Sequence, residues 1–415
     1  MITPTLDHKV SVVIPAKNAG DEFAVLLEKL KSQKGVREIE IVVVDSGSTD
    51  STAAIARKHG CKLIRIKPGE FTHSHSRNVG AGEASGDFIL FMVQDASPAG
   101  ERWVHALLNS LISLSSRGVV AATCREFPRV DSDLFYGFLM HEHYKFLEWR
   151  EADRITHMEE ERPGSLRKKG ALNNIACLIR KDVFDQYKLR GCYGEDIDLG
   201  ERLLRRGHKL ALLSSVKVIH SHNRPPFYYL KRHFTARLHP ADRSGGFSGI
   251  DPADPAGAFA SVYLLFRIMD GLARKVSAFS QGICSEDLWK LVHRELAQRI
   301  ATGLDKVPAA KGWHILEDQG LISFLKRFRF PSADPSHLNR LMPCVTERCR
   351  AAHEYLQPLY PLTDAWLLSE TASLLLKLTA SICGDYLACL SISGEGLRPH
   401  SPLMDEARAV LTEGI

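Results

Sequence analysis

The sequence lacks the features that would tie it to a disulfide framework, a membrane span or nucleic acid. Its nine cysteines are odd in number and scattered, with no CxxC pair, which argues against a disulfide scaffold or structural zinc and favours a reducing cytoplasm. No run of about eighteen uncharged apolar residues occurs, and residues 1–10 show no apolar signal core. The net charge is only +5, without a block of about five like charges, so no nucleic-acid partner is indicated.

The length and composition are those of a soluble protein with two domains. The chain has 415 residues, of which 44% are hydrophobic and 25% charged. Residues 244–257 are dominated by Gly, Pro, Ser, Ala and Asp, a composition typical of a linker. We therefore expect a first domain at 1–243, a linker at 244–257 and a helical C-terminal domain at 258–415.

The most apolar stretch of the C-terminal part, residues 365–393, contains three charged residues, Glu370, Lys377 and Asp385. Their presence favours a buried or amphipathic helix over a membrane span. Any membrane association is expected to be peripheral.

The first half of the chain alternates between strand patterns and helix patterns. This rhythm predicts a mostly parallel sheet covered by helices, and the charged segment 142–169 is expected to cross the sheet edge as a partly helical, mobile segment. The expected strands are 10–15, 38–44, 62–66, 88–93, 119–123, 209–213 and 216–219, and the expected helices are 21–33, 51–59, 78–84, 103–115 and 197–206.

Two acidic positions stand where such a sheet would bind a ligand. Asp95 follows the apolar strand 88–93, and Glu195 and Asp196 open the helix that continues through 197–206. Carboxylates at the C-terminal edge of an α/β sheet suggest a metal-held anionic leaving group and a general base. The alternative role for Glu195, Asp196 and Asp198 is the favourable interaction of negative charge with a helix N-terminus.

Two polar loops follow the first two strands and are expected to emerge side by side. An aspartate there can accept a hydrogen bond from N3–H of uracil or thymine, while Ser and Gly let the backbone approach a ribose or phosphate. For Ser48 and Asp50 the alternative role is helix capping. The loops supply the candidate donor-binding residues Pro15, Lys17, Asn18, Asp45, Ser46 and Ser48.

The motifs together resemble family 2 glycosyltransferases of the GT-A fold, in particular the bacterial rhamnosyltransferase branch. The resemblance covers about residues 10–222 and rests on IPAKN, VVDSGSTD, HSHSRNVGAGEASGDFILFMVQDASP and GEDIDLGERLLRRGHKLAL. It implies an α/β GT-A domain followed by an α-helical C-terminal domain.

The resemblance also assigns roles to residues of the metal and base sites. Asp95 matches the second carboxylate of the family's Asp-x-Asp, while Val93 stands where the first would be. The implied metal is Mg²⁺ or Mn²⁺, completed by His220 or, as an alternative, His222. Asp196 matches the catalytic base.

Further roles follow from the same resemblance. Glu195 would orient the base or the acceptor, and Arg77, Asn78 and Gln94 would lie on the donor side. His73 and His75 would either contact the sugar or shape the loop that precedes Arg77, and Asn173 or Asn174 would line the acceptor pocket.

Two attractive patterns are set aside. Gly80–Gly86 imitates a dinucleotide fingerprint but precedes a strand instead of following the first one. His141, Glu142 and His143 imitate a metal cluster but are better explained as exposed helix surface.

The expected activity is inverting, metal-dependent transfer of L-rhamnose from dTDP-L-rhamnose to a growing bacterial surface glycan, such as an O-antigen, a capsule or another envelope polysaccharide. The alternatives are a UDP-hexose or HexNAc transferase of the same fold and a non-catalytic scaffold subunit. The expected partners are a nucleotide-sugar donor and a lipid-linked or polymeric glycan acceptor. The C-terminal helices would contact that acceptor, a membrane surface or a second copy of the chain.

Overall fold

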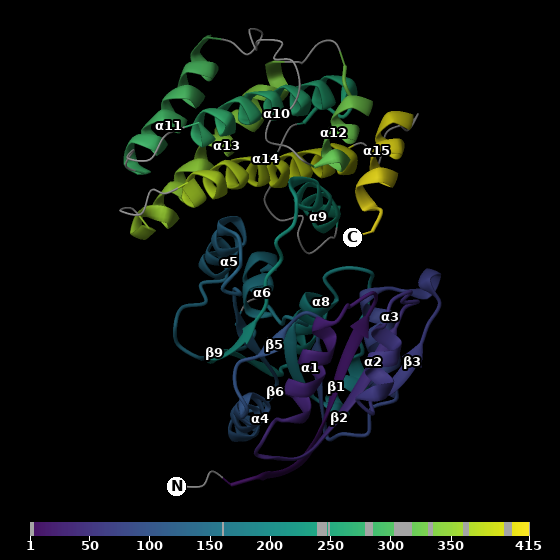
Figure 1. The fold of residues 1–415 in the computed structure, drawn as a ribbon. Helices are drawn as coiled ribbons and strands as arrows, with labels where there is room; N and C mark the ends of the chain where they lie inside the picture. Colours follow the sequence, from purple (N-terminus) through teal and green to yellow (C-terminus); the bar gives the residue numbers. More distant parts are fainter. Residues whose placement is uncertain are drawn as a thin grey trace. The chain divides into compact units, whose positions relative to one another are not determined.

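The computed structural model describes residues 4–159, 162–238, 247, 250–278, 285–302, 318–330, 335–359, 365–393 and 401–414. Its contacts divide the chain into two compact units (Figure 1). The first comprises residues 1–132 and 142–221, and the second comprises residues 133–141 and 222–415. Each unit is described by itself.

The first unit is built on one mixed sheet of nine strands with the order β3-β2-β1-β4-β8-β6-β9-β5, in which β7 also pairs with β9. The first four strands in this order are parallel, as expected from the alternating pattern. The sheet departs from a mostly parallel one because β8 runs antiparallel between β4 and β6. The strands are β1 (Leu6–Ala16), β2 (Val36–Asp45), β3 (Lys62–Arg65), β4 (Phe88–Met92), β5 (Ser97–Pro98), β6 (Val119–Phe127), β7 (Arg154–Thr156), β8 (Ala176–Arg180) and β9 (Lys209–Ile219).

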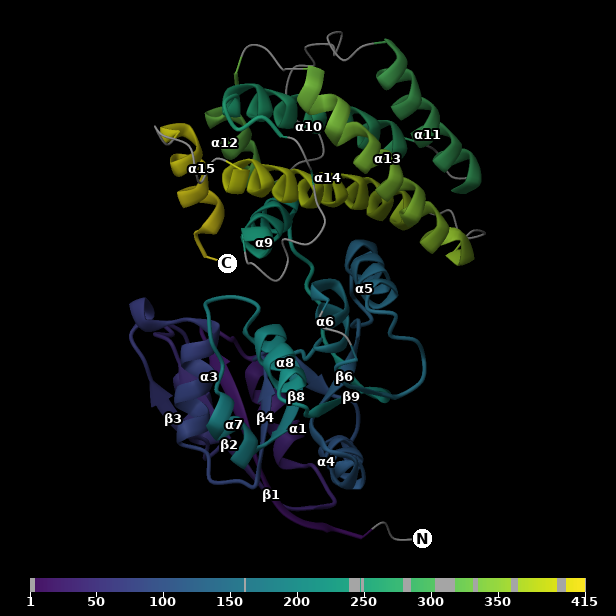
Figure 2. The ribbon, with the colours of Figure 1, turned by 180° about the vertical axis from the view of Figure 1, so that it is seen from behind.

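Helices cover both faces of this sheet. The side chains of β1 alternate between two cores, with Val12 and Ile14 on one face and Val13 on the other. The first face is covered by α1, α2 and α4, and the second by α3, α7 and α8, which lie in front of the sheet in Figure 2. The helices are α1 (Glu22–Lys31), α2 (Thr52–Lys58), α3 (His73–Gly82), α4 (Trp103–Ser113), α6 (Pro163–Lys169), α7 (Lys181–Tyr187) and α8 (Glu195–Arg205), and α5 (Leu134–Phe146) is shared between the two units.

The strand directions bring the candidate residues to one edge of the sheet. The C-terminal ends of β1, β2, β4, β6 and β9 meet at this edge, because these strands share one direction. The antiparallel strand β8 starts at the same edge, where Ala176 pairs with Met92. Segments before β8 and after β4, β6 and β9 are therefore neighbours although they are far apart in sequence.

Two local predictions need correction. The helix expected at 78–84 begins earlier, at His73, because the Thr72 hydroxyl accepts a hydrogen bond from His75 N–H and caps it. The two strands expected at 209–213 and 216–219 form one strand, β9, whose register against β6 shifts in the middle. Segment 142–169 is partly helical, as expected, since it contains the end of α5 and all of α6, and it also contains the short strand β7.

Two of the glycines that imitate a dinucleotide fingerprint stand where a side chain would not fit. A Cβ atom on Gly80 would lie 2.5 Å from Val13 Cγ1 and 2.9 Å from Val44 Cγ2, where α3 crosses the sheet. A Cβ atom on Gly86 would lie 2.7 Å from the backbone nitrogen of Ser11. These two positions therefore need glycine for close packing.

The described part of the second unit is helical, as expected, with a core formed by buried side chains from its long helices. Helix α14 packs along α9, so α9 belongs to this unit, and the contact division at residue 221/222 falls before the expected domain boundary at 243. The helices are α9 (Pro226–Leu238), α10 (Pro255–Ser277), α11 (Ser285–Thr302), α12 (Gln319–Arg327), α13 (Pro335–Leu356), α14 (Ala365–Ser393) and α15 (Pro402–Thr412). Short 3-10 turns occur at Pro68–Glu70 and Ser115–Arg117 in the first unit and at Gln357–Leu359 in the second.

The charges that interrupt α14 have partners within the second unit. Lys377 pairs with Asp133 at 2.6 Å, and Glu370 accepts a hydrogen bond from Leu134 N–H. Asp385 lies beside His233 and Arg237 of α9. Helices α10 and α14 are long and apolar enough to cross a membrane, but most of each apolar window is buried in the unit, which makes them weak evidence for spans.

Candidate active site

The two polar loops that follow β1 and β2 are joined by hydrogen bonds. Asn18, which has a positive φ of +49°, donates its N–H to Ser48 Oγ and accepts the N–H of Thr49 on its side-chain oxygen. Asp50 accepts the N–H groups of Gly20 and Thr52, so Asp50 caps α2 and also ties the loops together. The loops after β1 and β2 therefore lie side by side, as the sequence predicts.

Asp45 ends β2 with its side chain almost fully buried at this edge. Its Oδ1 accepts Ser48 N–H at 2.9 Å, and its Oδ2 lies 3.7 Å from Arg65 Nε. The N–H of Ser46 donates to Ala16 O, which closes the end of the β1–β2 pair. Asp45 shapes the loop through Ser48 instead of capping a helix.

Gln94 connects the end of β4 to the first loop. Its side-chain oxygen accepts Lys17 N–H at 2.8 Å, and its amide nitrogen donates to Lys17 O at 3.3 Å. Pro15 pairs with Val44 within the sheet. The donor-side candidates in the loops after β2, β1 and β4 thus form one continuous rim along this edge of the sheet.

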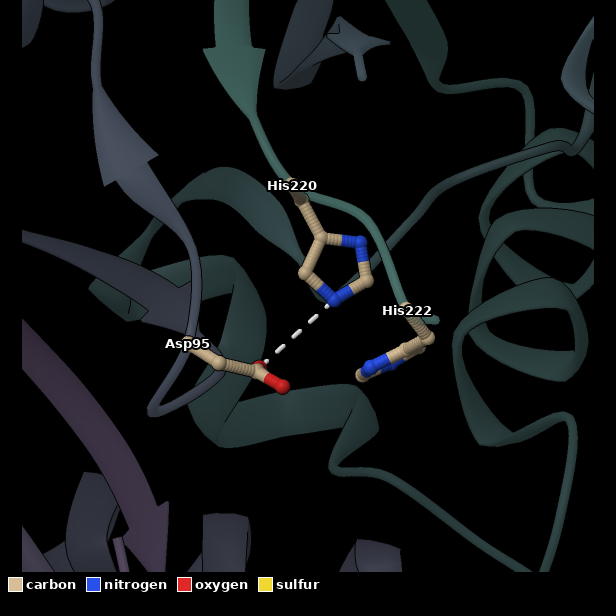
Figure 3. Close-up of side chains that lie close together, drawn as sticks. All are labelled: Asp95, His220 and His222. Atoms are coloured by element: carbon tan, nitrogen blue, oxygen red, sulfur yellow. Dashed lines mark ion pairs between the residues drawn. The ribbon is translucent and has the colours of Figure 1, made fainter. Parts of the chain in front are cut away.

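A candidate metal site lies next to this rim (Figure 3). His220 Nε2 lies 3.5 Å from Asp95 Oδ1, and ligand atoms of Asp95, His220 and His222 lie within 4.8 Å of one another. Two ligands of one ion with bonds of about 2.1 Å lie roughly 3 to 3.5 Å apart, so Asp95 and His220 fit a single divalent ion. His222 is the first residue of the second unit. One carboxylate with imidazole nitrogen suits Mn²⁺ better than Mg²⁺, which prefers oxygen ligands.

Glu126, which sequence patterns did not single out, is buried beside His220. Its Oε2 lies 3.0 Å from His220 Nδ1, and its Oε1 accepts a hydrogen bond from Asn173 Nδ2 at 2.6 Å. Burial by itself lowers the pKa of His220, but its hydrogen bonds to Asp95 and Glu126 outweigh burial and raise that pKa to about 9. The imidazole is therefore held between two carboxylates.

The candidate base, Asp196, stands in the first turn of α8, after Gly194 in a left-handed conformation with φ of +67°. Its carboxylate accepts the N–H groups of Asn174 at 3.1 Å and Ile197 at 2.9 Å. Burial and the neighbouring Glu195 charge raise the pKa of Asp196 to about 6, while the two N–H groups act in the opposite direction. A carboxylate with a pKa in this range remains ionised at neutral pH and is a better proton acceptor than an ordinary aspartate.

Glu195 is buried beside the base and paired with Arg77. Its Oε1 accepts hydrogen bonds from an Arg77 guanidinium nitrogen at 3.1 Å and from Asn174 Nδ2 at 3.0 Å. Arg77 Nε and Asn174 Oδ1 are buried, and neither has a hydrogen-bond partner among the described residues. Buried atoms of this kind are commonly satisfied by water or a ligand.

Two donor-side candidates, Arg77 and Asn78, have hydrogen-bond partners within the first unit. Arg77 is buried in its pair with Glu195, and the same guanidinium nitrogen donates to His73 O, so Arg77 supports the base region. The amide of Asn78 exchanges two hydrogen bonds with the backbone of Leu189, which anchors the loop before α8. The stretch expected as a histidine-rich loop is the first turn of α3.

Asp198 of α8 and the two histidines of α5, His141 and His143, also have partners. Asp198 accepts a hydrogen bond from Arg202 one turn later, a contact that stabilises α8. His141 packs against Tyr355, and His143 packs against Tyr144, each through ring contacts.

Residues 11–171 match the model of the family described as glycosyl transferase family 2. The match covers less than half of the chain and makes this part similar to family 2 glycosyltransferases, and the chain is a glycosyltransferase. The predicted fold class, a GT-A domain followed by an α-helical C-terminal part, is confirmed by this match together with the sheet and helices described above.

Among curated proteins, the chain is similar to two rhamnosyltransferases. The O-antigen chain rhamnosyltransferase WbaN of Salmonella anatum is 26% identical over 233 residues, which cover 54% of this chain and 70% of the relative. The O-antigen chain rhamnosyltransferase RfbN of Salmonella typhimurium is also 26% identical, over 232 residues with the same coverage. The resemblance to the rhamnosyltransferase branch is thereby confirmed.

Among solved structures, the chain is similar to a mannosyltransferase from Pyrobaculum calidifontis in complex with GDP-Man and Mn²⁺. It is 16% identical, has a TM-score of 0.45, and the match covers 84% of this chain and 87% of that one. A structure of the Staphylococcus aureus protein TarS with UDP-GlcNAc is 14% identical, with a TM-score of 0.39 and coverage of 83% and 88%.

Proposed function

We propose that the chain is an inverting, metal-dependent glycosyltransferase that transfers L-rhamnose from dTDP-L-rhamnose to a growing bacterial surface glycan. The observation that carries this proposal is the Asp196 carboxylate, held by two backbone N–H groups at the same sheet edge as Asp95 and His220. An O-antigen is the favoured glycan, since the two rhamnosyltransferase relatives are named for it.

The donor is expected to lie along the rim formed by the loops after β1, β2 and β4. Asp45 would accept N3–H of thymine, and the Asn18–Ser48 contact would shape the ribose and phosphate side of the loop. A bound Mn²⁺ or Mg²⁺, held by Asp95 and His220 with His222 as a further ligand, would offset negative charge on the departing diphosphate. The Asp45 side chain is almost fully buried, and it contacts Ser48 N–H and Arg65.

The transfer is a single displacement. Asp196 takes the proton of the acceptor hydroxyl while that oxygen bonds to the anomeric carbon and the bond from that carbon to the diphosphate oxygen breaks. The nucleoside diphosphate leaves with the bonding electrons, and the configuration at the anomeric carbon inverts because attack comes from the opposite side. Asn174 and Ile197 hold the carboxylate in place through their N–H groups.

The acceptor is proposed to be a lipid-linked or polymeric glycan, with the enzyme in the cytoplasm or peripheral at the inner face of the cell membrane. The apolar character of α10 and α14 is compatible with a membrane-proximal role, although most of their apolar surface is buried. The second unit would hold the acceptor, contact the membrane or bind a second copy of the chain.

The first test is a calorimetric titration of the full chain with dTDP, UDP and GDP, with Mn²⁺ and then with EDTA. We expect metal-dependent binding that is tightest for dTDP. Asp95→Ala should lose at least about tenfold in dTDP affinity with Mn²⁺ and change little with EDTA, because Asp95 acts through the metal.

Each other outcome of this titration has a meaning. Preference for UDP would overturn the rhamnose donor and favour a UDP-hexose or HexNAc transferase, and binding of no nucleotide would favour the scaffold alternative. An equal loss for Asp95→Ala in Mn²⁺ and in EDTA would contradict a metal-ligand role. Glu28→Ala, on the exposed side of α1, is a control expected to bind like the wild type.

The pH dependence of transfer should follow the base. Because only ionised Asp196 accepts a proton and its pKa is raised to about 6, kcat/KM should fall as the pH drops through about 6. Glu195→Gln removes the negative charge that helps raise this pKa while Arg77 remains, so the acidic limb should move to lower pH. The measurement is kcat/KM for the acceptor at saturating donor across the range, and an unmoved limb in Glu195→Gln would contradict the assignment.

Donor ionisation is the main confounding effect in that experiment. Calorimetric donor affinity and far-ultraviolet circular dichroism over the same pH range separate loss of donor binding or of fold from loss of the base. Glu83→Gln, an exposed surface change of the same type, should leave the limb in place.

A further inference from the structure

Two adjacent asparagines, Asn173 and Asn174, link the candidate metal site to the candidate base. Asn173 contacts the residue behind the metal ligand His220, and Asn174 contacts Asp196 and Glu195. Asn173 donates from its side chain to Glu126, which faces His220. Asn174 donates from its backbone to Asp196 and from its side chain to Glu195. All of these contacts lie within the first unit.

The amide of Asn173 has a fixed orientation. Its Oδ1 accepts Ile175 N–H at 3.0 Å, so its nitrogen is the atom turned toward Glu126. The backbone is fixed as well, because Asn173 O accepts hydrogen bonds from Ala176 N–H and from the Thr123 hydroxyl. Asn173 therefore presents a donor to Glu126, and its amide cannot flip without losing the hydrogen bond from Ile175 N–H.

Glu126 in turn determines which nitrogen of His220 keeps its proton when the neutral ring binds a metal. With one carboxylate oxygen accepting from Asn173, the other lies 3.0 Å from His220 Nδ1 and can only accept, so Nδ1 must be the N–H donor. Nε2 is the nitrogen that faces Asp95. A carboxylate behind the Nδ1–H of a ligating histidine fixes the ring and increases its basicity toward a metal.

We infer that Glu126 is a positioning residue that orients His220 so that Nε2 is presented to a divalent cation, and that Asn173 holds Glu126 in this role. The inference rests on the proposed function, since it deepens the candidate metal site. Glu126 acts through His220 and is not itself a ligand.

The test starts with Glu126→Gln, which preserves size and removes one acceptor. If the glutamine oxygen accepts from Asn173, its NH₂ group faces His220 Nδ1, which must then give up its proton and leave it on Nε2. If the glutamine is flipped, its NH₂ group meets the NH₂ group of Asn173. Either way, Mn²⁺ affinity should fall about 10- to 100-fold.

The matched rescue is the double variant Glu126→Gln/Asn173→Asp. An aspartate at 173 accepts from both Ile175 N–H and the glutamine NH₂ group, so the glutamine oxygen is again free to accept from His220 Nδ1. Mn²⁺ affinity should return to within about threefold of the wild type, because every donor in this group again faces an acceptor. A role in packing alone would not be restored by this second change.

Binding is measured as the loss of the free Mn²⁺ electron paramagnetic resonance signal, with Mn²⁺ alone and with saturating dTDP, and circular dichroism reports the fold. Glu83→Gln and Asn109→Asp, both exposed, serve as controls. If Glu126→Gln binds Mn²⁺ like the wild type, or if the double variant is as weak as the single one, the inference is overturned. If Glu126→Gln does not fold, the double variant alone decides. Absence of Mn²⁺ binding by the wild type would instead overturn the proposed metal dependence.

Discussion

Replacing Asp196 with asparagine should reduce the transfer rate by about 10²- to 10⁴-fold while leaving the donor affinity close to that of the wild type. Asparagine keeps the size of the side chain and its oxygen can still accept an N–H from Asn174 or Ile197, but it cannot take the acceptor's proton. The measurement is kcat for rhamnose transfer from dTDP-L-rhamnose, together with calorimetric dTDP affinity in the presence of Mn²⁺.

The matched control is Asp198→Asn, which makes the same chemical change two residues later. Asp198 pairs with Arg202, so this variant should keep nearly all of the transfer rate. Losing donor affinity to the same extent in Asp196→Asn and Asp95→Ala would contradict the separation of the base from the metal site.

The second large effect concerns the buried pair of Arg77 and Glu195. Arg77→Met should lower the free energy of unfolding of the first unit by about 3–5 kcal/mol, because it leaves the Glu195 charge buried without its partner. Differential scanning calorimetry of the full chain would show the affected transition at a lower temperature.

Removing both charges should be much less harmful than removing one. In Arg77→Met/Glu195→Gln, the glutamine oxygen still accepts from Asn174, and position 195 no longer carries an unpaired buried charge, so most of the lost stability should return. Lys34→Met removes a partner from an exposed ion pair with Glu101 and should leave the unfolding curve almost unchanged. An unfolding curve for Arg77→Met that matches the wild type would contradict a stabilising role for the ion pair of Arg77 and Glu195.

The parts of the fold that could be predicted from the sequence are those with local signals. The strands β1, β2 and β4 are short runs of β-branched and apolar residues that stop at polar residues, and their ends place Asp45 and Asp95 at one edge. The neighbouring loops were predicted to meet for the same reason, and Asn18 and Ser48 do meet. That β1, β2 and β4 are parallel is enough to predict that the loops after them lie at one edge of the sheet.

The rest depends on contacts between residues that are distant in sequence. Glu126 lies inside a strand and gains its role only because β6 and β9 are paired, which brings His220 alongside. Arg77 and Glu195 are separated by 118 positions, and nothing in either motif indicates that they form an ion pair. The early start of α3 follows from one capping hydroxyl, Thr72, at a place where the histidine-rich pattern is polar on all sides.

The C-terminal part shows the same contrast. Its helical character and the buried nature of residues 365–393 were predictable from composition. The packing of α9 on α14 was not, because the pairing of Asp385 with His233 and Arg237 joins segments about 150 residues apart.

The consecutive positions of Asn173 and Asn174 tie two parts of the candidate site to one segment of backbone. Asn173 contacts Glu126, which faces His220, and Asn174 contacts Asp196 and Glu195. Adjacent Cα atoms are separated by about 3.8 Å, a length that does not change when a loop moves. A displacement of the segment before β8 would therefore shift the partners of His220 and of Asp196 together.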